Sequence, residues 1–81
     1  MKRTKVKSTN LASIGFDEDK KELEVEFQGG RVYKYSAVPK DVYDALMAEN
    51  DKANAGDTDA SVGRLFINLV KMNDSYDFGK V

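Results

Sequence analysis

The sequence contains no cysteine, no histidine and no tryptophan, and only one proline among its 81 residues. Without cysteine the chain cannot form disulfides, thiolate zinc sites or a cysteine nucleophile. Without histidine it lacks the usual general base at neutral pH, the commonest metal ligand and the central residue of a Ser-His-Asp triad. An enzyme would have to rely on Asp, Glu, Lys, Ser or Tyr, and we expect neither catalytic activity nor a cofactor or metal.

Long apolar runs are absent as well, although hydrophobic residues make up 41% of the chain and suffice for a thin core. No run approaches the roughly 18 residues that a membrane-spanning helix needs. No apolar run follows the basic start, as one does in a secretory signal. We therefore expect a cytoplasmic protein that does not engage a membrane. Its length limits it to a single small domain.

Charge is nearly balanced, with 13 basic and 14 acidic residues and a formal net charge of −1. The distribution is uneven, because the first seven residues contain no acid and four bases, which are Lys2, Arg3, Lys5 and Lys7. The rest of the chain is net acidic. The sequence predicts a basic arm over residues 1–7. Such an arm is typical of nucleic-acid contact, or of a solvated start that joins the sheet at its end.

Three segments predict β-strands, over residues 11–17, 21–28 and 31–38. The second has the cleanest pattern, because three apolar residues alternate with three glutamates. Such alternation is typical of a strand with one buried face and one wet face. Polar and acidic residues between the first two segments supply a turn.

The glycine pair between the second and third strands allows two registers. A two-residue loop would place Lys34 on the apolar face. A three-residue loop, with Gly30 in the left-handed position, pairs the apolar faces and sets Glu24 across from Lys34. We favour the three-residue loop, with the cross-strand pairs Val25–Tyr33, Leu23–Tyr35 and Glu24–Lys34, because a slip of one residue would exchange the two faces.

Two helices are predicted after the strands, over residues 39–53 and 61–72, each with an apolar stripe at helical spacing. Gly56 follows the first as a stop, and Ser61 caps the second. The order of elements predicts an α+β fold, in which a three-stranded antiparallel sheet is followed by two helices packed on one face, β-β-β-α-α. The predicted organisation is a basic arm over residues 1–7, one domain over 8–72 and a frayed tail over 73–81.

Five pieces of sequence, taken in order, resemble a known family. Residues 6–17 read VKSTNLASIGFD. The others are Tyr33-Lys34-Tyr35, Val38-Pro39, Val42-Tyr43 with Leu46, and Ser61-Val62-Gly63 with Phe66. Together they resemble the KTSC domain over about residues 6–71. The segment 48–60 departs from the family pattern, because it is longer and more acidic.

The resemblance implies a small domain that occurs at the C-terminal end of some lysyl-tRNA synthetases and alone in bacterial and phage proteins. It suggests RNA binding and brings no catalytic residues. We expect the residues that carry the resemblance to have structural roles: Tyr33, Tyr35, Pro39, Tyr43, Ser61, Gly63 and Phe66.

Two features are candidates for ligand contact. Tyr33 and Tyr35 share a strand face and either stack nucleobases or pack in the core, and the favoured register indicates the core. Arg64 lies at the start of the second helix, where it would contact a phosphate or carboxylate. The complete set of candidate nucleic-acid or anion contacts is Lys2, Arg3, Lys5, Lys7, Arg31, Lys34 and Arg64.

Two functions remain open from the sequence. The first is a non-enzymatic binding module that engages a protein partner, such as a phage-like accessory or inhibitor protein, because the body is acidic and strand edges can accept another chain. The second is RNA or tRNA binding through the basic arm and Arg31, Lys34 and Arg64. Clustering of these bases on one face would favour RNA, and interspersed acids would count against it. A homodimer also fits, because a small domain gains stability from association.

Overall fold

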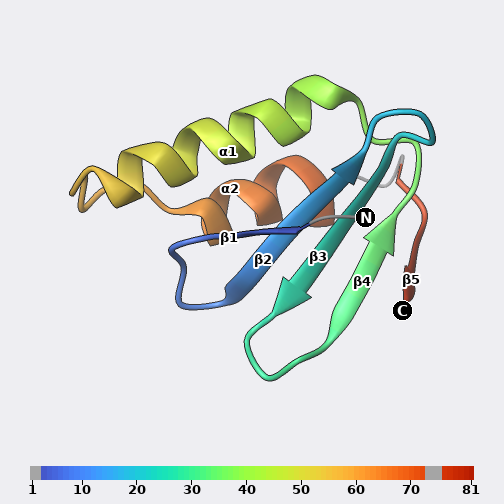
Figure 1. Ribbon diagram of the computed structural model, residues 1–81, viewed down its shortest axis with the longest axis horizontal. Helices are drawn as coiled ribbons and strands as arrows, with labels where there is room; N and C mark the ends of the chain where they lie inside the picture. The colour runs from blue at the N-terminus through green and yellow to red at the C-terminus, as the bar shows by residue number, and fades with distance from the viewer. Residues whose placement is uncertain (1–2, 73–75) are drawn as a thin grey trace.

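The computed structural model describes residues 3–72 and 76–81 as a five-stranded antiparallel sheet with helices on one face (Figure 1). The strands occur in the sheet in chain order. The elements are β1 Arg3–Lys5, β2 Leu11–Asp17, β3 Glu22–Phe27, β4 Val32–Tyr35, α1 Lys40–Asn54, α2 Val62–Phe66, η1 Ile67–Lys71 and β5 Phe78–Lys80. The predicted α+β class, with an antiparallel sheet and two helices, is confirmed.

The prediction of three strands is wrong, because two short strands extend the sheet at its edges. β1 pairs with β2, and β5 pairs with β4 (Figure 1). They come from the segments expected to form the arm and the tail. Each has three exposed residues without apolar alternation, so no periodic signal marks it. Backbone pairing with a neighbouring strand is what makes these segments strands.

The register predicted for the β3–β4 hairpin is confirmed. Glu24 faces Lys34, and the pairs on either side of it are those expected from the three-residue loop. Gly29 and Gly30 have φ values of 100° and 96°, in the left-handed region that favours glycine. The Phe27 N–H donates to the Arg31 carbonyl at 2.8 Å and closes the loop.

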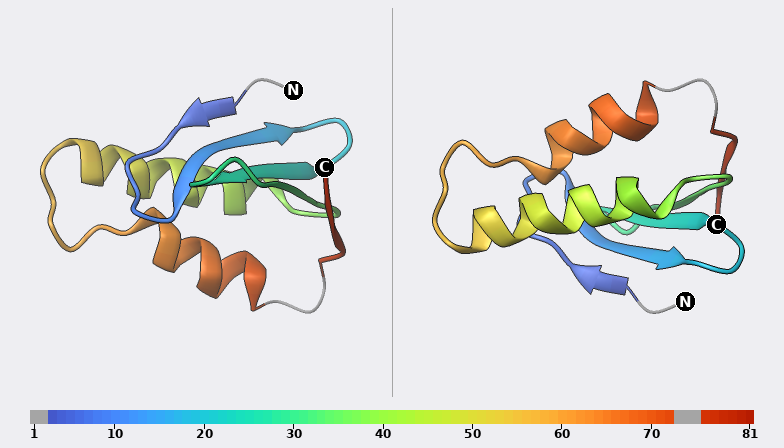
Figure 2. Two further views of the ribbon diagram at one scale, coloured as in Figure 1. Left: turned by 90° about the horizontal axis from the view of Figure 1, so that it is seen from below. Right: turned by 90° about the horizontal axis from the view of Figure 1, so that it is seen from above.

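The core lies between the apolar face of the sheet and the two helical segments (Figure 2). On α1, Leu46 is fully buried and Tyr43 stacks on Phe16 of β2 with ring centroids 5.3 Å apart. On α2, the Phe66 ring packs against Phe27 of β3. Because both sheet contacts involve the same face, both helices cover one side of the sheet and the other side stays open.

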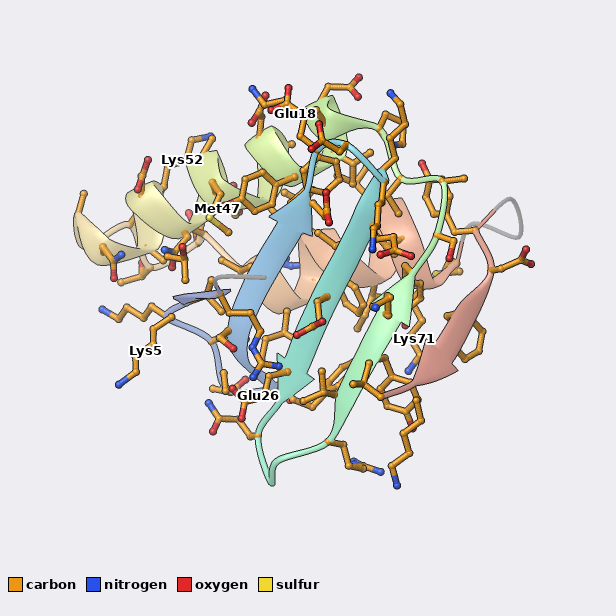
Figure 3. All side chains as sticks on the ribbon, turned by 45° about the vertical axis from the view of Figure 1, so that its right-hand side comes forward. Lys5, Glu18, Glu26, Met47, Lys52 and Lys71 are labelled. Carbon is orange, nitrogen blue, oxygen red and sulfur yellow. The ribbon has the colours of Figure 1, made fainter. Side chains whose placement is uncertain are left out.

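The ends of the helical segments follow the sequence signals. Gly56, with φ of 98°, ends α1 through the left-handed conformation, and the Ser61 Oγ accepts a hydrogen bond from Arg64 N at 3.2 Å. The predicted second helix changes from an α-helix to a π-helix at Ile67. The π-helical turn carries Lys71 at its end, close to the sheet edge formed by β4 and β5 (Figure 3).

Candidate binding groove

An open groove of about 370 Å³ lies between the β3–β4 hairpin, β5 and the end of η1. We call it the aromatic groove and define it by its lining residues, which are Phe27, Arg31, Tyr33, Tyr35, Lys71 and Phe78. An adjoining hollow of about 270 Å³ shares Phe27, Arg31 and Lys71 with it and continues toward Gly63 and Ile67. The two hollows form one recess on the helix-covered side of the sheet.

Strand register brings the aromatic rings of the groove together. Tyr33 and Tyr35 are two residues apart and therefore lie on the same face of β4. Phe78 of β5 faces Tyr35. The Phe78 ring stacks on Tyr35 with centroids 5.4 Å apart and approaches the Tyr33 ring at 6.3 Å. Phe27 meets the Tyr33 ring edge-on at 5.6 Å. These offset and edge-on arrangements are the ones that aromatic pairs prefer, and they build one continuous aromatic surface.

The depth of the groove is graded. Tyr35 at its base is only 4% exposed, Tyr33 is half-buried, and Phe78 at its rim is 67% exposed. Burial raises the pKa of the Tyr35 phenol above its usual value, and the neighbouring Tyr33 raises it further. The base of the groove is therefore a poor environment for negative charge, while its rim offers an exposed apolar ring.

The charge of the groove comes from bases only. Arg31 and Lys71 line it, and neither forms an ion pair with a carboxylate within residues 3–72 and 76–81. Lys80 faces Tyr33 across β4 and β5, so it belongs to the same side of the sheet. Of the residues in 3–72 and 76–81, no acidic one lines the groove or the adjoining hollow. The protein thus carries a cationic, aromatic recess although its net charge is −1.

The open face of the sheet has a different character, because acids and bases alternate on it. The Arg3 Nη1 lies 3.1 Å from the Glu24 Oε1, and the Lys34 Nζ lies 3.7 Å from the Glu22 Oε1. The Ser13 Oγ donates to the Glu26 Oε1 at 2.8 Å, on the face where Figure 3 shows Glu26. Glu24 lies opposite Lys34 as expected, but its ion pair is with Arg3.

A third hollow, of about 470 Å³, lies between the β1–β2 connection and the loop that joins α1 to α2. Its lining is mainly small and hydroxyl-bearing, with one base, Lys7, and one acid, Asp57. The described residues that line it include no aromatic residue and carry no excess of charge. Among the residues that the structure describes, no group of three or more acidic side chains could hold a metal ion. In the same part of the chain, no helix is long and apolar enough to cross a membrane.

Comparison with known proteins identifies the family of the chain. The family model of the KTSC domain matches residues 7–55, well over half of the sequence. The chain belongs to the KTSC domain family. The crystal structure of a KTSC domain protein from Yersinia pestis superimposes with a TM-score of 0.76 at 28% identity, covering 99% of this chain and 96% of that one. An uncharacterized protein of Stutzerimonas stutzeri strain A1501 is 47% identical over 47 residues, which span 58% of this chain and 66% of that protein.

The matched KTSC segment contains only part of the aromatic groove. Residues 7–55 include β3 and β4, whose hairpin supplies Arg31 and three of the four aromatic rings that line the groove. Lys71 and Phe78 lie beyond it. The groove of this KTSC protein is therefore completed by the C-terminal part of the chain, which the structure adds through η1 and β5.

The bases proposed from the sequence do not gather at one place in this KTSC domain. Of the seven, Arg31 is the one that lines the aromatic groove, and Lys2 lies outside the described residues. Arg3 and Lys34 are paired with acids on the open face, where Lys5 faces Ser13. The others are elsewhere: Lys7 donates its backbone N–H to Asn50 Oδ1 at 2.8 Å, and Arg64 Nη2 donates to the Asp59 carbonyl at 3.2 Å.

The residues that carry the family resemblance contribute to packing and to helix ends. Pro39 precedes α1 in an extended conformation, Tyr43 stacks on Phe16, and Ser61 caps α2. Gly63 lies against the β1–β2 connection, where an added Cβ would come within 3.2 Å of Ser8 Oγ. The ring of Phe66 is 1% exposed. Tyr33 and Tyr35 pack in this framework and also line the groove.

Sequence reasoning missed Lys71 and Phe78 as groove residues. Both belong to segments with no ligand-binding motif, and about 40 residues separate them from Arg31 and Tyr33 in the chain. No local signal in the sequence marks them, because their place in the groove follows only from the return of the last strand to the edge of β4.

Proposed function

We propose that this protein is a small, non-enzymatic binding module that engages a protein partner through the aromatic groove. The observation that carries the proposal is the lining of the groove, to which the described residues contribute four aromatic rings, two bases and no acid. Aromatic residues and arginine are enriched in the cores of protein interfaces, where they supply most of the binding energy. A groove with a buried aromatic floor and an exposed aromatic rim can receive an anchoring side chain of a partner.

Exposed apolar residues beside the groove support the same proposal. Ile67, which lines the adjoining hollow, is 37% exposed, and Met72, directly after Lys71, is 71% exposed. With Phe78 they are three of the four large apolar residues exposed in residues 3–72 and 76–81, and all lie in the C-terminal part of the chain. Ile67 and Phe78 line the recess itself, and exposed apolar side chains at a recess are typical of an interaction site.

The charge of the groove defines the chemistry of the partner. Two bases with no acid among the described residues that line the groove attract a segment that combines carboxylates with an apolar anchor, since complementary charge speeds encounter and rejects wrong partners. Within the part of the chain that the structure describes, the groove offers phenols and bases but no carboxylate that could act as a general base, which supports binding rather than catalysis. A cytoplasmic accessory or inhibitor protein of the phage type is the role that we propose for such a module.

RNA binding is the alternative, and the same groove provides its best support. Nucleobases of the RNA can stack on Phe78 and Tyr33 while Arg31 and Lys71 contact its phosphates. Against it stand the pairing of Arg3 and Lys34 with glutamates and the separate positions of Lys7 and Arg64. Nucleic-acid domains usually present a net basic face, and this chain has a pI of about 5.3. We therefore rank the protein partner first.

The test uses a fluorescent peptide of seven residues, Glu-Ser-Phe-Ser-Glu-Ser-Phe, in which acidic and apolar residues alternate along one face of an extended strand, and follows its anisotropy on titration with the full chain. We expect it to bind more tightly than the same peptide with lysine in place of glutamate, and more tightly than octauridine. Arg31→Glu or Phe78→Ala should weaken binding by at least about tenfold, since both change groove contacts. The matched control Arg64→Glu, on α2 and outside the groove, should leave it unchanged.

Two outcomes would overturn the proposal. One is equal binding of the acidic and basic peptides, or none of either. The other is tighter binding of octauridine that weakens steeply with salt and depends on Arg31 and Lys71, because released counterions produce that salt dependence. The second outcome would establish the RNA alternative.

A further inference from the structure

We propose that the acidic partner segment binds as an extended strand along the outer edge of β5, so that the sheet gains a sixth strand beside the aromatic groove. This inference rests on the proposed function and specifies how the partner is held. In strand addition, backbone hydrogen bonds supply affinity and alternate side chains supply specificity. Both components are present at β5.

The backbone of β5 presents its hydrogen-bonding groups in alternating directions. The Ser36 N–H donates to the Asp77 carbonyl at 2.8 Å, and the Val81 N–H donates to the Val32 carbonyl at 2.8 Å. In an antiparallel ladder, every second residue faces the same neighbour. Gly79 therefore faces β4, while the N–H and C=O groups of Phe78 and Lys80 point away from it.

The outward-pointing N–H and C=O groups of Phe78 and Lys80 lie at an edge of the sheet. β5 is the last strand in the sheet order, and no described helix or strand lies outside it in Figures 1 and 2. An exposed row of backbone donors and acceptors is a template for another strand. Phe78 and Lys80 thus offer two donors and two acceptors to an incoming chain.

The side chains of the same two residues lie on the groove side of the sheet. Phe78 faces Tyr35, and Lys80 faces Tyr33, both of which line the groove. A residue that pairs with Phe78 or Lys80 would have its Cβ about 5 Å from theirs and on the same face. Alternate residues of the added strand therefore come beside the groove, where an apolar one meets Phe78 and an acidic one meets Lys80.

The opposite edge of the sheet offers no comparable site. β1 has the sequence Arg3-Thr4-Lys5, and the Arg3 side chain is already paired with Glu24. Charged side chains on a short strand are a common protection of sheet edges. β1 also lies at the far edge from the aromatic groove, since three strands separate it from β5.

Charge argues for an acidic partner rather than a second copy of this chain at β5. Antiparallel pairing of two β5 strands would bring two copies of Lys80 to one short ladder, with Lys71 and Arg31 of each copy nearby. Like charges placed opposite one another destabilise a strand pair. An acidic segment removes this repulsion and pairs with all three bases.

The first test methylates backbone nitrogens of the peptide probe, which leaves every side chain in place. Two versions carry N-methyl groups on alternate residues, one on the odd positions and one on the even positions. In an added strand only one set of N–H groups faces β5. We expect one version to bind at least about tenfold more weakly than the parent and the other to retain at least half of its affinity.

The second test changes the protein. Lys80→Pro removes the outward N–H and the charge, whereas the matched variant Lys80→Ala removes only the charge. Proline is tolerated at an edge position whose N–H faces outward. We expect Lys80→Pro to bind the parent peptide at least about tenfold more weakly than Lys80→Ala does, with circular dichroism spectra of the two variants that coincide.

The outcomes separate this inference from the function on which it rests. Strand addition is overturned if the parent peptide binds with the expected dependence on Arg31 and Phe78, but both methylated versions bind like the parent. The proposed function would then stand, with the peptide held by side chains alone. If the parent peptide does not bind at all, the proposed function itself fails. The methylated peptides require no change in the protein, so folding does not confuse the result.

Discussion

Among single residues, Tyr35 links the core of the protein to its groove. Its ring packs against Phe66 with centroids 5.5 Å apart on one side and stacks on Phe78 on the other. The raised pKa of its phenol, caused first by burial and then by Tyr33, means that the folded protein favours the neutral form. This residue therefore couples stability to pH in the alkaline range.

We predict that the protein loses stability as pH rises from the unfolded pKa of 10.0 through the higher folded pKa of Tyr35. The sign follows because the unfolded chain releases this proton first, so the folded state binds more protons in that range. Below pH 10 the contribution is constant. Urea unfolding at pH 8, 10 and 11 should give a smaller loss for Tyr35→Phe than for the wild type.

The matched control for this prediction is Tyr43→Phe, which retains the stacked ring on α1 and leaves Tyr35 in place. The difference between the wild-type and Tyr35→Phe slopes isolates Tyr35 from the other groups that titrate in the same range. Equal slopes for these two proteins would contradict the prediction. So would a loss of slope in the Tyr43→Phe control.

Between elements, the approach of α2 to the β1–β2 connection depends on Gly63. The Ser8 Oγ accepts hydrogen bonds from Asn10 N and Leu11 N, both at 3.2 Å, and so holds the turn that leads into β2. An added Cβ on Gly63 would come within 3.2 Å of that oxygen. The neighbour is fixed by two hydrogen bonds and cannot move without weakening them.

We predict that Gly63→Ala destabilises the protein although alanine favours a helix by about 1 kcal/mol. In the Ser8→Ala background the oxygen is gone, and the same substitution should cost less or stabilise. The two changes should therefore couple by at least about 0.5 kcal/mol in a double-mutant cycle measured by urea unfolding. Additive effects would show that the close approach does not restrict this position.

The elements also show which parts of the fold the sequence could predict. The β3–β4 register could be deduced because alternation marks the faces and the loop glycines limit the turn. The edge strands β1 and β5 could not, because three exposed residues have no periodicity. The change to a π-helix at Ile67 was also hidden, since an apolar stripe does not distinguish i→i+4 from i→i+5 hydrogen bonding.

The candidate site was predictable in the same uneven way. Arg31, Tyr33 and Tyr35 come from one hairpin, and its predicted register already set Tyr33 and Tyr35 on one strand face. Lys71 and Phe78 reach the groove only through the helical segment and the last strand, which depend on long-range pairing. Of the seven candidate bases, Arg3 and Lys34 pair with glutamates of β3.

For the whole molecule, the two faces of the sheet differ in how their charges are arranged. On the open face, bases and glutamates neutralise one another. On the helix-covered side, bases remain without acidic neighbours at the aromatic groove in the described part of the chain. A small domain of net charge −1 can therefore attract an acidic partner at one place and avoid nonspecific contact elsewhere.

The position of β5 at the edge of the sheet indicates that it shields β4 from solvent and from other chains. All three of its residues are exposed, so it buries little surface of its own. It covers the edge of β4, and Phe78 covers part of the Tyr33 and Tyr35 rings. β5 should thus contribute more to the solution state of the protein than to its stability, because an uncovered edge with apolar rings invites association.

We predict that a chain ending at Asp77, which keeps Tyr76 against the core, loses only about 1 to 3 kcal/mol of unfolding free energy, because it loses two aromatic pairs of about 0.5 to 1.5 kcal/mol each. It should nevertheless self-associate as its concentration rises, in light scattering coupled to size exclusion. Gly79→Pro is the full-length comparison, because it removes an N–H that faces β4 and should release β5 with the composition almost unchanged. If both variants keep the same mass as the wild type at every concentration, the edge of β4 does not need this cover. If instead both variants unfold, β5 is needed for the stability of the sheet although its residues are exposed, and the prediction is wrong.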